Sequence, residues 1–264
     1  MSTSLPLANT PVTESRPLPA LGGFNLTALS LEIRRVLRNR RTVMFTVVFP
    51  SLFFFMFRST GGARAANAAR IQAYVLVSMA VYGAMIGTTA GGAAVAVERS
   101  LGWSRQLRLT PLRPSAYIAM KVLTAMVLGL VAVLSAFAVG AISGVRMAPS
   151  VWVLCGLAAW GSSLVFAAFG LFMGFLLPSE NVMQFVGPML AILALGGGLF
   201  VPLQQLPPLM RQIATLSPAY GVGVIARAPL IGGITVGAIA SVIGWTTAFG
   251  IGAMLLFRRD TERV

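Results

Sequence analysis

Long apolar runs, separated by short charged or proline-containing segments, fill the chain from Arg41 to Arg258. A run of about 18 or more apolar residues is long enough to cross a bilayer as an α-helix. Almost no Asp, Glu, Lys or Arg interrupts these runs, as the hydrocarbon interior requires of helices that face lipid. The pattern therefore predicts an all-α membrane protein.

The boundaries of the runs predict about six transmembrane helices. We place them at residues 43–57, 71–97, 117–143, 152–177, 182–201 and 231–257. An even number of crossings leaves both termini on one side of the membrane. Because arginines concentrate near the two chain ends and in the 98–114 loop, the positive-inside rule makes that side the cytoplasm. We therefore expect a multi-pass protein of the cell membrane with both termini cytoplasmic.

Residues 1–24 are rich in Pro, Ser and Thr and lack the apolar core of a signal peptide. They predict a disordered cytoplasmic tail. The rest of the chain, 25–264, is expected to form one transmembrane domain.

Residues 25–41 predict an amphipathic helix that lies in the membrane interface. Asn25 is a suitable N-cap, and Glu32 occupies the polar side together with arginines near anionic headgroups. Its apolar positions recur at helical spacing, and they are Leu26, Leu29, Ile33, Val36 and Leu37. Its arginines are Arg34, Arg35 and Arg38.

Composition supports a membrane protein and narrows its partners. Mean hydropathy is +0.85, and hydrophobic residues make up 57% of the chain. The net charge of +14 would suggest nucleic acid in a soluble protein, but here the positive-inside rule explains it, so we expect no nucleic-acid partner. With no histidine and the single cysteine Cys155, an intrachain disulfide and a zinc site of Cys and His are excluded.

Residues for catalysis or nucleotide binding are missing from the sequence. A phosphate-binding P-loop needs a Gly-Lys-Ser/Thr step, and Met120 precedes the only lysine, Lys121. A Ser-His protease is excluded because there is no histidine. The spans show no clear mid-membrane charge, which argues against a carrier driven by protons. We therefore expect a non-enzymatic chain that binds no cofactor or metal.

Glycines at a spacing of four share one face of the second span: Gly83, Gly87 and Gly91. Such a face lets two helices approach closely. Packing within the chain is the favoured interpretation, and a subunit interface is the alternative.

The loop at 98–114 mixes apolar anchors, Trp103 and Leu109 among them, with basic residues, and Pro111 bounds it. One interpretation is an interfacial helix at the headgroups. The other is a docking helix that fits a groove on a cytoplasmic partner.

Two ordered motifs resemble the ABC-2 family of transporter permeases, and the resemblance covers roughly residues 25–257. The first lies at the end of the second span and beyond, and consists of Glu98, Arg99, Gly102, Arg105, Leu109, Thr110, Pro111, Tyr117 and Lys121. The second lies in the proline-punctuated outside segment, and consists of Gly198, Pro202, Leu206, Pro207, Ile213, Leu216, Ser217, Pro218 and Tyr220. Drug-resistance exporters of the daunorubicin type look most similar.

The resemblance implies a permease subunit that pairs with a cytoplasmic ABC ATPase and with a second, identical or homologous, permease subunit. ATP and Mg would be bound by the ATPase. The 25–41 helix and the 98–114 coupling helix would contact it through Arg34, Arg35, Arg38, Glu98, Arg99, Gly102, Trp103, Arg105, Leu109 and Pro111. Residues 202–230 would form extracellular re-entrant helices that cap the exit, with Pro202, Pro207, Pro218 and Tyr220.

The expected cargo is an amphiphilic or lipophilic compound, in contact with membrane lipid, because Met and Phe side chains repack around varied shapes. Drug or antibiotic efflux is the first interpretation. Export of a cell-envelope lipid or lipid-linked glycan by the same mechanism is the second. A self-sufficient secondary carrier or channel is the alternative from another class.

Overall fold

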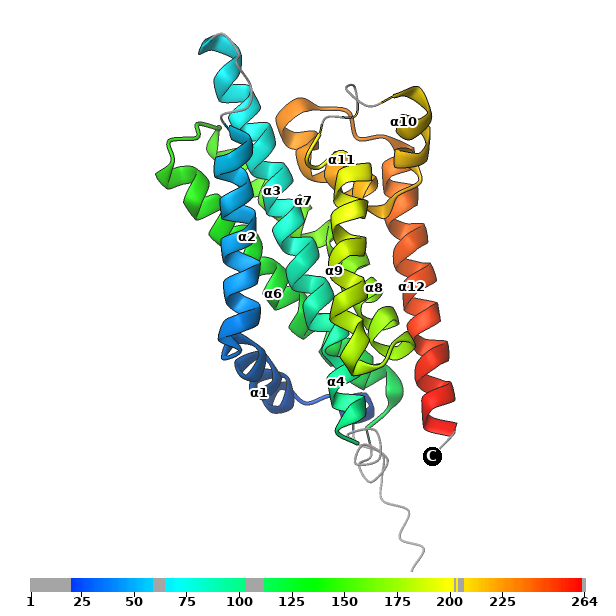
Figure 1. The fold of residues 1–264 in the computed structure, drawn as a ribbon. Helices are drawn as coiled ribbons and strands as arrows, with labels where there is room; N and C mark the ends of the chain where they lie inside the picture. Colours follow the sequence, from blue (N-terminus) through cyan, green and yellow to red (C-terminus); the bar gives the residue numbers. More distant parts are fainter. Residues whose placement is uncertain (1–19, 59–64, 103–111, 202, 204–206, 263–264) are drawn as a thin grey trace, which may run out of the picture.

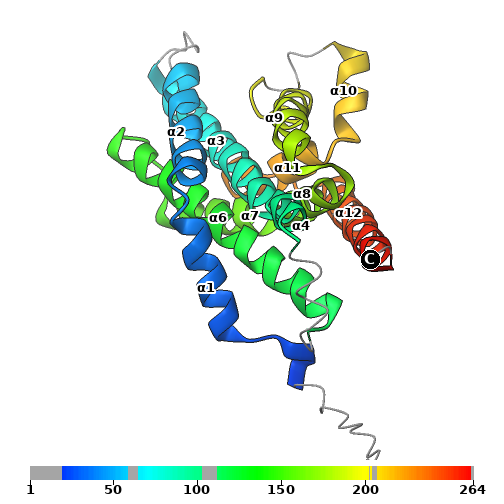
Figure 2. The ribbon, with the colours of Figure 1, turned by 60° about the horizontal axis from the view of Figure 1, so that its bottom comes forward.

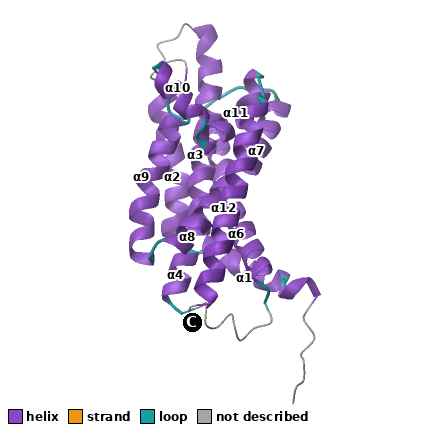
Figure 3. Cartoon of the chain, turned by 90° about the vertical axis from the view of Figure 1, so that its right-hand side faces the viewer, coloured by secondary structure: helices purple, strands orange, loops and turns teal. Residues whose placement is uncertain are grey.

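The computed structural model describes residues 20–58, 65–102, 112–201, 203 and 207–262. Every regular element within these ranges is a helix, and most helices run nearly side by side in one elongated bundle (Figures 1 and 3). The predicted all-α membrane class is confirmed.

Five continuous helical segments are long and apolar enough to cross a membrane. They are α2 (Arg40–Arg58), α3 (Ala65–Ala93) continued by α4 (Val95–Ser100), α6 (Pro114–Ile142), α7 (Pro149–Ser162) continued by α8 (Leu164–Leu176), and α12 (Val236–Glu262). The fifth predicted span corresponds to α9 (Ser179–Gly196), which runs along the bundle (Figures 1 and 3) but is not among these five. A sixth crossing by α9 therefore stays a prediction.

Helix α3 forms the centre of the bundle. It packs against α2, α6 and α8 along its length, and α7, α9 and α11 also contact it. Its residues from Leu76 to Met85 are all buried. By contrast α2 and α12 leave most of their apolar side chains exposed. Those outer surfaces suit lipid, because an apolar surface costs nothing in hydrocarbon.

Close approach between α3 and its neighbours depends on glycine. A Cβ on Gly91 would lie 2.6 Å from the Cα of Ala125 in α6, and a Cβ on Gly170 in α8 would lie 2.3 Å from the carbonyl oxygen of Thr89 in α3. Neither distance is possible for real atoms. The absent side chains let the backbones pack directly, as small residues do between membrane helices.

Helix α1 (Leu26–Leu37) crosses one end of the bundle, which we name the α1 end (Figure 2). The Asn25 side chain caps it by accepting the backbone N–H of Thr27 at 2.8 Å. The helix ends at Leu37, so Arg40 and Arg41 belong to α2 and not to the predicted 25–41 helix.

The predicted disordered tail, 1–24, is ordered at its C-terminal end. Ala20–Gly23 forms a 3-10 turn, and the Gly22 carbonyl accepts the backbone N–H of Arg113 at 2.8 Å, next to the start of α6. Prediction of disorder therefore does not hold for these four residues. Residues 1–19 lie outside the described ranges.

Two short helices occupy the opposite end of the bundle, which we name the α10 end (Figure 1). They are α10 (Pro208–Thr215) and α11 (Pro218–Ile231). Helix α10 is largely exposed, whereas α11 is apolar and packs against α7, α12, α3 and α9. Thus much of the predicted outside segment, 202–230, is folded into the bundle. The last span begins at Val236, five residues later than predicted at 231, because Gly232 and Gly233 take positive φ and end α11.

Candidate functional site

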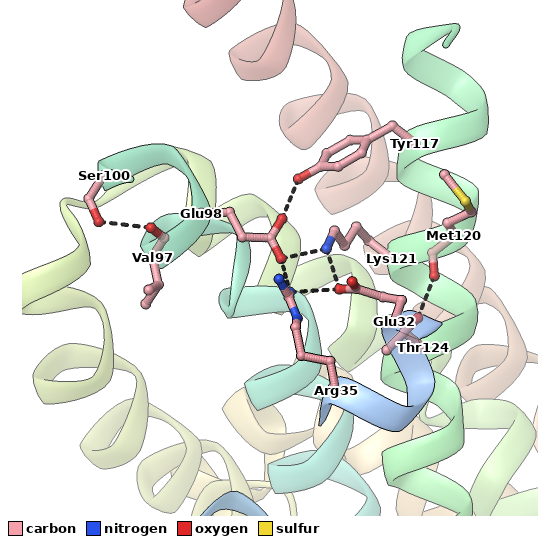
Figure 4. Close-up of polar contacts among 9 residues, drawn as sticks. All are labelled: Glu32, Arg35, Val97, Glu98, Ser100, Tyr117, Met120, Lys121 and Thr124. Carbon is pink, nitrogen blue, oxygen red and sulfur yellow. Dashed lines mark hydrogen bonds and ion pairs between the residues drawn. The ribbon is translucent and has the colours of Figure 1, made fainter. Parts of the chain in front are cut away.

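Five polar side chains from three helices meet at the α1 end. Figure 4 shows Glu32 and Arg35 of α1, Glu98 of α4, and Tyr117 and Lys121 of α6 pointing toward one another. We name these residues the charge cluster. The i, i+3 and i, i+4 spacings within α1 and α6 place each pair on one helix face. The cluster joins a peripheral helix to two helices of the bundle.

Glu98 is the centre of the charge cluster. Its Oε1 accepts Lys121 Nζ at 2.5 Å and also Arg35 Nη2, and its Oε2 accepts the Tyr117 hydroxyl at 2.8 Å. Glu32 accepts Arg35 Nη2 at 2.8 Å and Lys121 Nζ through its own Oε1. Two carboxylates and two cations alternate, so each charge has two partners of opposite sign.

The charge cluster is buried on the bundle side and open on the α1 side. The side chains of Glu98 and Lys121 are 7% and 6% exposed, whereas that of Arg35 is 52% exposed. Burying a charge costs several kcal/mol unless it is paired and hydrogen-bonded. Partial burial alone would lower the pKa of Arg35, but the hydrogen bond and the charge of Glu98 raise it above its usual value. Arg35 therefore stays cationic and completes the pairing.

Arg99, the neighbour of Glu98, faces the other way and makes a second set of contacts. Its Nε and Nη2 donate to the two carboxylate oxygens of Asp260 in α12 at 2.9 and 2.8 Å. Its Nη1 donates to the carbonyl oxygens of Gly174 and Phe175, in the last turn of α8, at 3.1 and 2.9 Å. A cation there suits the negative end of the helix dipole. Adjacent residues of α4 thus connect it to α1 and α6 on one side and to α8 and α12 on the other.

Other residues of the predicted coupling set lie in different settings. Arg34 of α1 and Arg38, directly after its end, are exposed, where a partner or headgroups could reach them. Gly102 takes φ +74 after α4, a conformation that favours glycine and ends the helix. Trp103, Arg105, Leu109 and Pro111 lie outside the described residues. Because Glu98 is buried, its carboxylate is not available for the expected direct contact with an ATPase in this structure.

The predicted exit residues lie at the α10 end, except for Pro202, which is outside the described ranges. Pro207 and Pro218 precede or open α10 and α11, where proline is tolerated because the first N–H groups have no helical partner. Tyr220 lines a cavity of about 530 Å³ between α10, α11 and α12. The remaining lining residues are Thr215, Leu216, Thr235, Gly237, Ser241 and Trp245.

Arg227 is a charged residue that the sequence analysis placed in the outside segment, but it is buried. It is 3% exposed, and its Nη1 donates to the Ser78 hydroxyl at 2.9 Å and to the Gly198 carbonyl at 3.2 Å. Arg227 is the lone charge in the apolar stretch from Pro218 to Ile231, and this feature of the sequence could have marked it as a buried charge.

The glycines of the second span lie against helices of the same chain. A Cβ added to Gly83 would contact Pro50 of α2, and one added to Gly87 would contact Thr46 of α2. A Cβ added to Gly91 would contact Ala125 of α6. This face therefore packs within the chain, in line with the favoured interpretation.

Ligands for a metal are not gathered anywhere in the described ranges, where no group of three or more His, Cys, Asp and Glu side chains occurs. Lys121, the only lysine, is occupied by two carboxylates. The charge cluster and Arg99 link helices through ion pairs. A displacement of α1 or α4 must therefore either move the helices paired with it or break the pairs.

Comparison with known proteins identifies the family. The profile of the ABC-2 type transporter family matches residues 26–231, which is most of the chain. The chain is also 29% identical over 194 residues to YvfS of Bacillus subtilis (strain 168), an inferred transport permease, in an alignment that covers 73% of this chain and 79% of that protein. Its five membrane-length helices agree with this match, and the chain belongs to the ABC-2 type transporter family and is a transmembrane permease of an ABC transporter.

Proposed function

We propose that this permease exports amphiphilic or lipophilic compounds, with drug or antibiotic efflux as its role, driven by ATP that a separate cytoplasmic ABC ATPase hydrolyses with Mg. A second permease subunit, identical or homologous, completes the transporter. Family membership supports the partnership with an ATPase. The resemblance to daunorubicin-type exporters in the Glu98–Lys121 and Gly198–Tyr220 motifs supports the direction and the cargo.

The observation that carries the proposal is the charge cluster. It ties α1, a peripheral helix with exposed arginines, to the two helices that pack most closely at the centre of the bundle, α3 with its continuation α4, and α6. A partner that displaces α1 therefore acts on the central helices through buried ion pairs. Rigid helices linked by paired charges transmit a displacement better than a flexible loop does.

Arg99 extends this connection across the bundle. Through Asp260 and the last carbonyls of α8 it joins α4 to α8 and α12. In the proposed cycle, closure of the ATPase subunits moves α1 and the 98–114 segment, and α4 distributes that movement to both halves of the bundle. ATP and Mg stay on the ATPase, and this chain contributes the path for the cargo.

Aromatic side chains near the α10 end favour lipophilic cargo. Phe53 and Phe57 of α2, Tyr82 of α3 and Phe200 form one ring cluster with neighbouring centroids 4.8 to 6.0 Å apart. Aromatic rings supply a large apolar contact area with loose geometric demands. Export of a cell-envelope lipid or lipid-linked glycan by the same mechanism is the second candidate, because such a surface also suits acyl or isoprenoid chains.

Affinity purification of the tagged chain in mild detergent tests the partnership. We expect a nucleotide-binding subunit to co-purify in stoichiometric amount, with ATP hydrolysis that vanadate inhibits. In the assembled complex, Arg35→Ala should leave hydrolysis in place and reduce cargo export per ATP, whereas Arg146→Ala, an exposed arginine outside the predicted coupling set, serves as the control.

Either of two results would contradict this proposal. A lone, inactive chain, even after crosslinking in native membranes, would favour the self-sufficient carrier or channel. Equal export per ATP in the wild type and in Arg35→Ala would remove the charge cluster from the coupling path while leaving the ATPase partnership intact.

A further inference from the structure

Arg227 is a buried cation between α11 and α3, and no carboxylate of the described residues pairs with it. Arg227 is 3% exposed, and its contacts with Ser78, Gly198 and the Tyr74 ring, 4.7 Å from the guanidinium carbon, are all to neutral groups. A buried charge is expensive unless a charge of opposite sign balances it. In membrane proteins such a residue commonly marks a functional site.

Within the described residues, the carboxylates are placed elsewhere. The sequence holds six: Glu14, Glu32, Glu98, Glu180, Asp260 and Glu262. Glu32, Glu98 and Asp260 are ion-paired at the α1 end. Glu180 begins α9, whose opposite end precedes Gly198, and 18 helical residues separate the two ends by about 27 Å. Within the described part of the chain, no carboxylate contacts Arg227.

The depth of Arg227 matches one headgroup layer of a bilayer. It is bonded to Ser78, and Glu98 follows Ser78 by twenty residues (98 − 78) along α3 and α4, which corresponds to about 30 Å of helix. That length equals the hydrocarbon thickness of a bilayer, about 30 Å. If the charge cluster lies at one headgroup layer, Arg227 lies at the other.

Two glycines hold the guanidinium in place. A Cβ on Gly223, one turn before Arg227 in α11, would lie 2.9 Å from Arg227 Nη2, so only glycine accommodates this conformation. Gly198 takes φ +74, and the turn around it directs its carbonyl to Arg227. The hydrogen bonds to Ser78 and Gly198 both use Nη1, whereas a guanidinium carries five N–H donors suited to carboxylate or phosphate.

The cavity at the α10 end lies along the same side of α11 as Arg227. Tyr220 lines that cavity and precedes Arg227 by seven residues, which is two helical turns and therefore the same helix face. Trp245 and the hydroxyl groups of Thr235 and Ser241 complete an amphipathic lining.

From these observations we propose that Arg227 binds the anionic headgroup of an amphiphile at the α10 end, through a phosphate or carboxylate group. This inference deepens the proposed function, because it assigns acidic amphiphiles as the preferred cargo class or as a resident lipid. Arg227 supplies the charge and paired N–H donors, Ser78 and Gly198 orient the guanidinium, and Tyr220 borders the entry.

Binding of dodecyl phosphate to the purified full chain tests the site without the ATPase. The chain is purified in dodecyl maltoside, and bound dodecyl phosphate is counted by native mass spectrometry, with dodecyltrimethylammonium as the probe with the same tail and the opposite charge. We expect Arg227→Gln to bind dodecyl phosphate about tenfold more weakly than the wild type, because a charge-assisted contact is lost. Binding of the ammonium probe should not weaken.

Two further variants keep the test decisive. Arg211→Gln removes an exposed arginine of α10 and should bind like the wild type. Ser78→Asp places a carboxylate beside Arg227 and should suppress dodecyl phosphate binding while Arg227 is still present, which covers the case in which Arg227→Gln does not fold. A phospholipid that co-purifies with the wild type and is lost in Arg227→Gln would identify a resident lipid, whereas exchangeable dodecyl phosphate would identify cargo.

Unchanged dodecyl phosphate binding in Ser78→Asp, or in folded Arg227→Gln, would overturn the inference. That result is independent of the proposed function, which stands or falls on the co-purifying ATPase.

Discussion

At the residue scale, two adjacent side chains, Glu98 and Arg99, connect α4 to different helices of the bundle. Glu98 binds Arg35, Lys121 and Tyr117, and Arg99 binds Asp260 and two carbonyl oxygens of α8. Neighbouring positions on a helix point in different directions, so the pair can engage partners on two sides of α4. Glu98 should contribute most to stability, because it and Lys121 are the buried charges of their network.

Glu98→Gln should destabilise the chain by about 3 kcal/mol, since it leaves the buried Lys121 ammonium with one fewer counter-charge. Glu98→Gln with Lys121→Met should recover most of this loss, because Glu32 and Arg35 still pair at 2.8 Å and no unbalanced charge remains. The unfolding midpoint in detergent can be followed by a thiol-reactive dye, since Cys155 is the only cysteine and is buried. A double variant as unstable as the single one would contradict the pairing.

Arg99→Lys should loosen the last turns of α12, because an ammonium cannot reproduce the two-pronged contact with Asp260. The pair is partly exposed, so we expect a loss of about 1 kcal/mol, seen as roughly fivefold faster amide exchange near Asp260. Hydrogen–deuterium exchange measures this directly. Arg259→Lys, an exposed neighbour, is the control, and unchanged exchange in Arg99→Lys would assign the order of α12 to other contacts.

At the element scale, the bundle is held by direct backbone contact around α3. The outer helices α2 and α12 expose broad apolar surfaces, while α3 and α8 approach until no side chain fits at Gly170. In a membrane the hydrophobic effect does not drive helices together, so van der Waals contact between close backbones contributes more. Loss of that contact should therefore be costly.

Gly170→Ala should lower stability by about 2 kcal/mol, because its Cβ would lie 2.3 Å from the Thr89 carbonyl oxygen and force α3 and α8 apart. Gly244→Ala is the matched control in α12, where a Cβ meets nothing within 4 Å. It should stabilise the helix by roughly 0.5–1 kcal/mol. The Cys155 reactivity assay compares the two variants, and equal midpoints would show that the helices adjust freely.

At the scale of the whole molecule, the helices place the first and last described residues, Ala20 and Glu262, on one side. The 3-10 turn at Ala20–Gly23 packs at the start of α6, and the C-terminal end of α12 pairs with α4, so both lie at the α1 end (Figures 1 and 2). The short helices α10 and α11 lie at the other end. If α9 also crosses the membrane, the chain crosses six times, and an even number of crossings agrees with both described ends lying on one side.

Labelling of intact cells with a membrane-impermeant maleimide tests this topology in a Cys155→Ala background. Gln212→Cys in α10 should react from outside, whereas Ser30→Cys and Arg259→Cys should react only after permeabilisation, because all three positions are exposed in the structure. Reaction of Arg259→Cys and Gln212→Cys from the same side would contradict the crossing assigned to α12. If Gln212→Cys reacted only after permeabilisation and the other two variants reacted in intact cells, the orientation in the membrane would be the opposite of the predicted one.

The fold class, the run of membrane-length helices and the N-cap of α1 could all be predicted from the amino-acid sequence. Each of these follows from hydropathy or spacing within a short window, since a helix that faces lipid must be apolar along its own length. The motif residues Glu98, Arg99, Tyr117 and Lys121 could be marked as important, but their roles could not be assigned. Which way a side chain points depends on what packs beside its helix.

Which charged residues are buried and which of them pair depends on the packing of the helices. This packing buried Glu98, which the sequence analysis expected to contact a partner, by bringing α1 and α6 onto α4. Because α11 folds against α3, it also buried Arg227, which a hydropathy reading assigns to an outside segment. Pairing across 63 residues, as between Arg35 and Glu98, leaves no periodic trace in a sequence, because the contact is set by helix packing and not by local spacing.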